Sequence, residues 1–337
     1  MITVEHLTKY YGDHLAVDDL SFEIGEGHVY GFLGPNGAGK STTMNMMTGC
    51  LSATDGHVRI DGFDIFEQPT EAKRRIGYLP EQPPLYLNES PMEYLRFVAE
   101  TKGLRGEERM KQINEVVELT GIGDVKNRRI STLSKGYRQR VGIAQALLGK
   151  PEVIILDEPT VGLDPIQIIE IRDLIKELGQ SHTVIFSSHI LSEVQTICDR
   201  ILMINKGKLV AFDAPEELEK KLVAPEELLL RCEAEVETAR AILSGLEHIT
   251  SLSFDETESP SVAVRVGTDC ENIDTLAREI FFAFAARGAA LLELSPKKGT
   301  LEDVFLELAD HDAEAPTAQD ETSEEKEAET DDGNPEA

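Results

Sequence analysis

Runs of consecutive apolar residues recur between more polar, helix-like segments over the first 220 residues or so of the chain. Three of these runs, at 29–33, 153–156 and 183–186, contain almost only apolar residues. Strands that helices cover on both faces have this composition, whereas half-exposed strands alternate apolar and polar residues. The pattern therefore predicts an α/β fold built around a mainly parallel sheet.

Polar residues follow each of these runs directly. A glycine-rich loop follows the first run, Asp157 and Glu158 follow the second, and Ser187-Ser188-His189 follows the third. Open α/β sheets bind their ligands at the carboxyl ends of the strands. We therefore expect these three segments to converge on one site.

The segment from about 87 to 150 is mostly polar and helical. Ser90-Pro91-Met92-Glu93 combines a helix cap, a proline at the first helical position and a glutamate at the third. Apolar residues then recur at helical spacing within 105–120. This segment is expected to form a helical subdomain inserted into an α/β domain of residues 1–222.

A second unit is expected over residues 223–310. Strand and helix patterns follow one another there in the order βαββαβ, which indicates a small α+β domain with a ferredoxin-like fold as the candidate. Residues 311–337 hold eleven Asp or Glu, one Lys and no Leu, Ile, Val or aromatic residue, which predicts a disordered acidic tail. The tail serves either solubility or regulation and partner binding.

Composition narrows the function classes. The 337 residues carry a net charge of −29, which disfavours nucleic acid as a main partner because that usually needs a basic face. The four cysteines are far apart and form no C-x-x-C pair, so neither zinc nor a disulfide framework is indicated and a reducing cytosol fits. The longest apolar stretches are too short to span a bilayer, so a membrane role would require a partner.

Residues 34–41 read Gly34-Pro35-Asn36-Gly37-Ala38-Gly39-Lys40-Ser41, the pattern G-x-x-x-x-G-K-[ST] of phosphate-binding loops. The glycines let backbone N–H groups surround a polyphosphate, the lysine reaches the terminal phosphates, and the hydroxyl can bind Mg²⁺. The helix after the loop presents its N-terminus to the anion. The loop predicts a nucleoside triphosphate site, but it leaves open whether the protein is a kinase, a GTPase, a motor or a transporter ATPase.

Two further motifs depend on this context. Asp157 can hold Mg²⁺ and Glu158 can orient an attacking water, although by themselves they could be two exposed acids that begin a loop. Leu133-Ser134-Lys135-Gly136-Tyr137 opens a helix and offers a second anion site, although a capped surface helix has the same local pattern.

These segments occur together in one protein family. Gly34–Ser41, Leu133–Tyr137, Val153–Glu158, Gly162-Leu163-Asp164 and His189 resemble, in order and rough spacing, the motifs of the ATP-binding cassette (ABC) transporter ATPases over about residues 1–220. Kinases and GTPases lack the second anion motif and the terminal histidine. The chain is most similar to ATPases of ABC-2-type exporters, including drug-export, sodium-export and gliding-motility ATPases, whose C-terminal extension resembles residues 299–305.

The resemblance implies a role for each motif residue. Glu158 would be the catalytic base, and His189 would contact the γ-phosphate. Ser41 and Asp157 would hold Mg²⁺, with Glu81 at the position that senses the metal. The expected ATP-binding residues are Tyr11, stacked on the adenine, then Gly34, Pro35, Asn36, Gly37, Ala38, Gly39, Lys40, Ser41 and Thr42, and, from a second subunit, Ser134, Gly136 and Asp164.

Two positions depart from the family pattern. Lys135 and Tyr137 stand where the signature Leu-Ser-Gly-Gly-Gln has Gly and Gln, while the phosphate-contacting Ser134 and Gly136 remain. The glutamine expected after residues 76–80 is Glu81, with Gln82 as the alternative assignment. A glutamate can still bind Mg²⁺ or water, but it adds charge and lacks an N–H donor.

The resemblance implies an ATP-hydrolysing subunit in which two cassettes enclose two ATP molecules, as a homodimer or with a second ABC ATPase subunit. Dimer closure would drive a separately encoded multi-span permease, for export, and would hold the chain in the cytoplasm at the inner face of the cell membrane. The alternative is a soluble ABC ATPase switch without a permease, although such relatives typically carry two cassettes or a long coiled-coil insertion. A regulatory cassette that only binds ATP is disfavoured, because Glu158 and His189 are both present.

Overall fold

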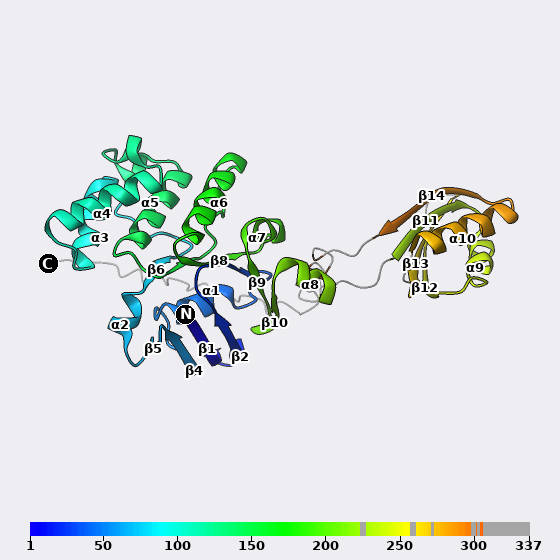
Figure 1. Cartoon of the computed structure of the whole chain (residues 1–337), viewed down its shortest axis with the longest axis horizontal. Helices are drawn as coiled ribbons and strands as arrows, with labels where there is room; N and C mark the ends of the chain where they lie inside the picture. Colours follow the sequence, from blue (N-terminus) through cyan, green and yellow to red (C-terminus); the bar gives the residue numbers. More distant parts are fainter. Residues whose placement is uncertain (223–226, 257–260, 271–272, 298–300, 302–303, 306–337) are drawn as a thin grey trace, which may run out of the picture.

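The computed structural model describes residues 1–222, 227–256, 261–270, 273–297, 301 and 304–305. Figure 1 shows a larger unit, which contains residues 1–222, and a smaller unit, which contains residues 227–297. No helix within the described residues has the length and apolar character needed to cross a membrane.

A six-stranded sheet forms the centre of the larger unit. Its order is β10-β9-β3-β8-β7-β6; the last five strands are parallel and β10 is antiparallel to β9. The strands are β3 (Val29–Leu33), β6 (Ile76–Leu79), β7 (Val153–Leu156), β8 (Thr183–Ser188), β9 (Arg200–Asn205) and β10 (Lys208–Asp213). Along β7, Ile154 and Leu156 pack in one core and Val153 and Ile155 in another. The predicted parallel sheet with two buried faces is confirmed.

A second, antiparallel sheet covers one face of the central sheet. Its order is β2-β1-β4-β5, from β1 (Ile2–Tyr11), β2 (His14–Ile24), β4 (Asp55–Ile60) and β5 (Phe63–Asp64). Its apolar residues share a core with β3 and with helix α1 (Lys40–Met47). Short helix α2 (Pro69–Lys73) leads from this sheet to β6.

The opposite face carries helices, which Figure 1 shows above the central sheet. The expected helical insertion contains α3 (Pro91–Thr101), α4 (Gly106–Leu119) and α5 (Lys135–Leu147), with two short 3-10 turns, Gly123–Val125 and Ile130–Thr132. Ser90 and Glu93 form the predicted capping box of α3. Helices α6 (Pro165–Gly179), α7 (Leu191–Ile197) and α8 (Pro215–Leu222) complete the unit.

The smaller unit has the predicted βαββαβ order and its own core. It contains β11 (Glu227–Glu233), α9 (Val236–Leu243), β12 (Ile249–Glu256), β13 (Val262–Thr268), α10 (Ile273–Ala286) and β14 (Ala290–Lys297). All neighbouring strands are antiparallel in the order β12-β13-β11-β14, which is the split βαβ arrangement.

The chain beyond the smaller unit contributes to the core of the larger one. Leu301 is fully buried in the cluster beneath the helices of the larger unit, and Phe305 packs against that cluster, as does Leu218 of α8. The range expected for the accessory domain, 223–310, includes Leu301 and Phe305, but their side chains pack with the larger unit. The predicted acidic tail, 311–337, lies outside the described residues.

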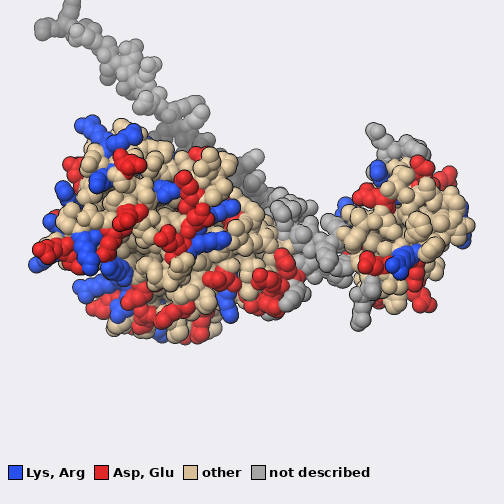
Figure 2. All heavy atoms as spheres, turned by 45° about the horizontal axis from the view of Figure 1, so that its top comes forward, with Lys and Arg blue, Asp and Glu red and all other residues tan. Residues whose placement is uncertain are grey.

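Charged side chains of both signs share the surface of the larger unit. In the view of Figure 2, Lys and Arg lie between Asp and Glu over most of that unit. The net charge of the full chain is nevertheless strongly negative.

Candidate functional site

The glycine-rich loop connects β3, which is buried along its whole length, to α1. Gly39 has φ +101°, and a Cβ there would lie 2.7 Å from the Ala16 carbonyl oxygen. A Cβ on Gly34 would lie 2.2 Å from the Ile204 carbonyl oxygen. Both positions therefore require glycine, one for its backbone conformation and both for space.

Lys40 lies inside this loop and is only 6% exposed. Its ammonium donates hydrogen bonds to the carbonyl oxygens of Gly34 (2.8 Å) and Pro35 (3.1 Å), and lies 3.6 Å from Glu158 Oε1. Burial lowers the pKa of Lys40 below the ordinary lysine value, while the charges of Glu158 and Asp157 oppose the shift. The loop thus fixes a desolvated cation beside the predicted catalytic carboxylate.

Two oxygen ligands suited to Mg²⁺ meet at the carboxyl end of β7. Ser41 Oγ lies 3.1 Å from Asp157 Oδ1, and Ser187 Oγ donates to the same oxygen at 2.6 Å. The Ser187 hydroxyl also accepts a hydrogen bond from the Glu158 backbone N–H at 2.7 Å. Hydroxyl and carboxylate oxygens are the donor type that Mg²⁺ prefers, so these residues fit the metal that the sequence predicts.

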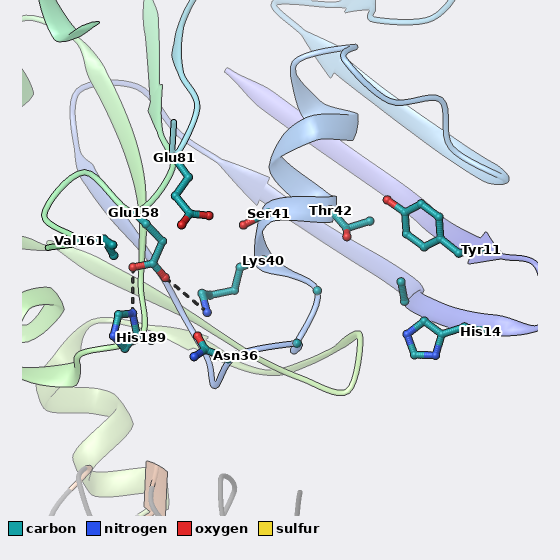
Figure 3. Close-up of a pocket in the computed structure, with 13 residues that line it drawn as sticks. Tyr11, His14, Asn36, Lys40, Ser41, Thr42, Glu81, Glu158, Val161 and His189 are labelled. Atoms are coloured by element: carbon teal, nitrogen blue, oxygen red, sulfur yellow. Dashed lines mark hydrogen bonds and ion pairs between the residues drawn. The ribbon is translucent and has the colours of Figure 1, made fainter. Parts of the chain in front are cut away.

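Glu158 is held between a cation and an imidazole. Its Oε2 lies 2.9 Å from His189 Nδ1, and its Oε1 faces Lys40 (Figure 3). The backbone of Glu158 has φ +46°, a left-handed conformation that is uncommon for residues other than glycine. Such backbone strain persists where the surrounding structure enforces it, which is typical of functional sites.

Lys40, Ser41, Glu158 and His189 border one open cavity of about 490 Å³. Figure 3 shows Glu81 near Ser41 and Glu158, with Thr42 and Tyr11 on the opposite side of Lys40. Tyr11 is half exposed, and His14 is a further lining residue that the sequence did not indicate. Among the predicted ATP-binding and metal residues, those that line the cavity are Tyr11, Asn36, Gly37, Gly39, Lys40, Ser41, Thr42 and Glu81, and Gln82 is not among them. Gly34, Pro35 and Ala38 of the loop, and the predicted metal ligand Asp157, are not among the lining residues of this cavity.

The three ATP contacts predicted to come from a second subunit lie around a separate cavity of about 480 Å³. It is lined by Ser134, Gly136 and Asp164, with Tyr137 and Arg140 beside them. Ser134 caps α5 by accepting from the Tyr137 N–H at 3.3 Å, and Asp164 caps α6. The structure therefore divides the predicted ATP contacts between two sites on one chain.

Comparison with known proteins identifies the family of the chain. A family model described as "ABC transporter" matches residues 17–161. The linearmycin resistance ATP-binding protein LnrL of Bacillus subtilis is 32% identical over 309 residues, which cover 91% of this chain and 98% of LnrL. The chain belongs to the ABC transporter ATP-binding protein family. It is an ABC ATPase.

Other relatives match chiefly the cassette. The bacitracin transport ATP-binding protein BcrA of Bacillus licheniformis is 41% identical to this ABC ATPase over 223 residues, 66% of the chain and 72% of BcrA. Among solved structures, cbiO1 of Clostridium perfringens, part of the ABC transporter complex cbiONQ, has a TM-score of 0.60 at 30% identity and covers 65% of this chain and 90% of its own.

A second solved structure shows two cassettes as a dimer. The cassette MJ0796, solved as a dimer bound to ADP and Pi, has a TM-score of 0.58 at 28% identity, covering 64% of this chain and 98% of its own. Members of the family bind nucleotide and function as dimers with a membrane permease partner. The fold and nucleotide binding predicted from the sequence are confirmed.

Proposed function

We propose that this chain is the ATP-hydrolysing subunit of an ABC-2-type exporter. Relatives named for bacitracin transport and linearmycin resistance, and the cassette NatA, support this subgroup. ATP binding closes two cassettes on each other, hydrolysis reopens them, and this motion drives a separate multi-span permease. The chain then lies in the cytoplasm at the inner face of the cell membrane.

The division of the ATP contacts between two cavities carries this proposal. The first cavity has the phosphate loop, Glu158 and His189, while Ser134 and Gly136 border the second. The N-terminus of α5 attracts anions through its free N–H groups and helix dipole. A second subunit, the same chain or another cassette, would present that helix end to the ATP held by the first.

Each residue at the phosphate end then has a role. Ser41, Asp157 and Glu81 would hold Mg²⁺, and the ion would supply positive charge to neutralise the phosphates. Glu158 accepts a proton from the attacking water, and His189 contacts the γ-phosphate and orients the Glu158 carboxylate. Tyr11 at the cavity edge stacks on the adenine, and Asp164 lies at the subunit interface.

The test compares two matched variants. The molar mass of each in solution, with and without ATP, shows whether it is a monomer or a dimer. Glu158→Gln should form an ATP-dependent dimer with little turnover. Glu158→Gln/Gly136→Arg should bind ATP but remain a monomer, because the arginine fills the second cavity. A single variant Gly136→Arg that remains a monomer in ATP and still hydrolyses ATP at the wild-type rate would refute the proposal.

A separate measurement distinguishes the exporter from the soluble switch. The wild-type chain, produced with its neighbouring genes, should co-purify from solubilised membranes with a multi-span protein, and Glu158→Gln should retain that partner in ATP. ATP-dependent dimers that never enrich with a membrane protein would favour the soluble switch.

A further inference from the structure

A buried carboxylate lies behind the hydrolysis site. Glu193 of α7 is only 1% exposed and does not line the ATP cavity. Its Oε2 accepts hydrogen bonds from Thr160 Oγ1 at 2.8 Å and from Ser188 Oγ at 2.9 Å. Arg172 of α6 approaches the other oxygen, with Nη2 3.5 Å from Oε1.

A buried carboxylate is costly unless polar partners compensate for the loss of water. Here two hydroxyls and one guanidinium do so. Both hydroxyls belong to segments that carry predicted catalytic groups, because Thr160 follows Glu158 by two residues and Ser188 directly precedes His189. One oxygen atom of Glu193 therefore joins the two loops.

The loops after β7 and β8 carry Glu158 and His189, and contacts between the loops are needed to keep these two side chains together. The contact between Glu158 and His189 spans the ends of neighbouring strands β7 and β8, and the Glu158 backbone is in the left-handed region. Ser187 makes one connection between the loops, through Asp157 and the Glu158 N–H. Glu193, which does not line the ATP cavity, makes the second, through Thr160 and Ser188.

We infer that Glu193 is a positioning residue for ATP hydrolysis. Its carboxylate fixes the distance between segments 158–160 and 188–189, and thereby holds the Glu158 carboxylate against His189. It touches neither of these side chains in the described hydrogen bonds, so it acts through Thr160 and Ser188. This inference rests on the proposed ATPase mechanism.

The most selective variant is Thr160→Val, which removes one hydroxyl at nearly constant volume. We expect kcat to fall about ten- to a hundredfold, since small displacements of catalytic groups have effects of this order. KM for ATP, and ATP affinity measured with a fluorescent analogue, should stay within about twofold because the cavity lining is intact. Thr160→Ser keeps the hydroxyl and should restore kcat.

Two further variants test the carboxylate itself. Glu193→Gln retains an acceptor for the hydroxyls but places an amide against Arg172, so its kcat should lie between those of wild type and Glu193→Ala.

In a double-mutant cycle, Thr160→Val and Ser188→Ala should be non-additive, because both remove contacts with the same oxygen.

Thr120→Val is the matched control for a purely structural effect. The Thr120 hydroxyl is also buried, but it bonds to the Val116 carbonyl oxygen within the helical insertion. It should lower thermal stability and leave kcat of the folded protein unchanged. If Thr160→Val and Glu193→Gln behave like Thr120→Val, Glu193 is structural only and the inference is wrong. If wild-type protein neither dimerises with ATP nor hydrolyses it, the proposed function fails instead.

Discussion

His189 Nδ1 lies 2.9 Å from Glu158 Oε2, although the two residues follow different strands of the central sheet. The other Glu158 oxygen faces Lys40, so the carboxylate has a charged group on one side and an imidazole on the other. Its orientation is therefore determined by two residues that also border the phosphate end of the cavity.

Removing the imidazole should slow hydrolysis more than it weakens binding. We expect His189→Ala to lower kcat about a hundredfold, the lower range for a group that assists proton transfer, with a small change in ATP affinity. Steady-state ATPase assays and equilibrium ATP binding separate the two effects. His14→Ala is the control, because His14 lines the same cavity beside Tyr11; an equal loss of kcat in both variants would contradict the assignment.

Ser187→Ala should destabilise the protein as well as slow it. The variant leaves the Glu158 N–H without its acceptor in a buried site, which costs about 1–3 kcal/mol of unfolding free energy. Denaturant unfolding monitored by circular dichroism measures this loss. The exposed Ser181→Ala should stay within about 0.5 kcal/mol of wild type. A Ser187→Ala protein as stable as wild type would show that Ser187 does not support the Glu158 backbone.

Glu81→Gln should weaken the response to Mg²⁺. Glu81 adds a negative charge to a site that already contains Asp157 and Glu158, and its loss should raise the Mg²⁺ concentration for half-maximal ATPase by several fold, or roughly 1 kcal/mol. Mg²⁺ titrations at fixed ATP provide the measurement. Glu89→Gln, an exposed change outside the cavity, should leave the titration unaltered. An identical midpoint in Glu81→Gln would exclude a role for this charge in metal binding.

Alkaline pH should weaken ATP binding earlier than an ordinary lysine would. Burial lowers the pKa of Lys40, so its charge is lost as pH rises through a value below the usual lysine range. Between those two values the unfolded chain binds more protons, so this residue makes the free energy of unfolding rise with pH while ATP affinity falls. ATP titrations from about pH 7 to about pH 10 test this, and Lys40→Arg, which stays charged, should show little pH dependence. A wild-type affinity independent of pH would refute the prediction.

Leu301→Ala should destabilise the cassette, not the accessory unit. Leu301 is fully buried in the core of the larger unit, so its truncation should cost about 2–5 kcal/mol. Denaturant unfolding of the full chain can be monitored through the loss of nucleotide binding, and this signal reports on the cassette. Leu292→Ala, at an exposed position of β14, is the control. An unchanged midpoint for Leu301→Ala would mean that the packing is dispensable.

The central sheet and the phosphate loop can be predicted from the sequence, because each has a local residue pattern. Val153–Leu156 is apolar at every position since both faces of β7 are buried, and the loop glycines are required by backbone geometry and space. The capping box of Ser90 and Glu93 is likewise a local pattern.

The supporting contacts of the site leave no such pattern. Ser187 bonds to a residue 30 positions away and Glu193 to one 33 positions away, and neither residue type is unusual after a strand or in a helix. The packing of Leu301 with the larger unit also depends on distant contacts. Tertiary structure, not local sequence, selects these partners, so only the folded chain identifies them.

Leu218 precedes the accessory unit, Leu301 follows it, and both are buried in the same core of the cassette. The unit is therefore an insertion between two segments of one domain and not a terminal addition. Because the entropy of closing a loop grows slowly with its length, evolution can lengthen, exchange or delete this unit at little cost to the ATPase. Substitutions at Leu301 or Phe305, in contrast, act on the ATPase itself, so these two positions should change more slowly among related genes than the unit that precedes them.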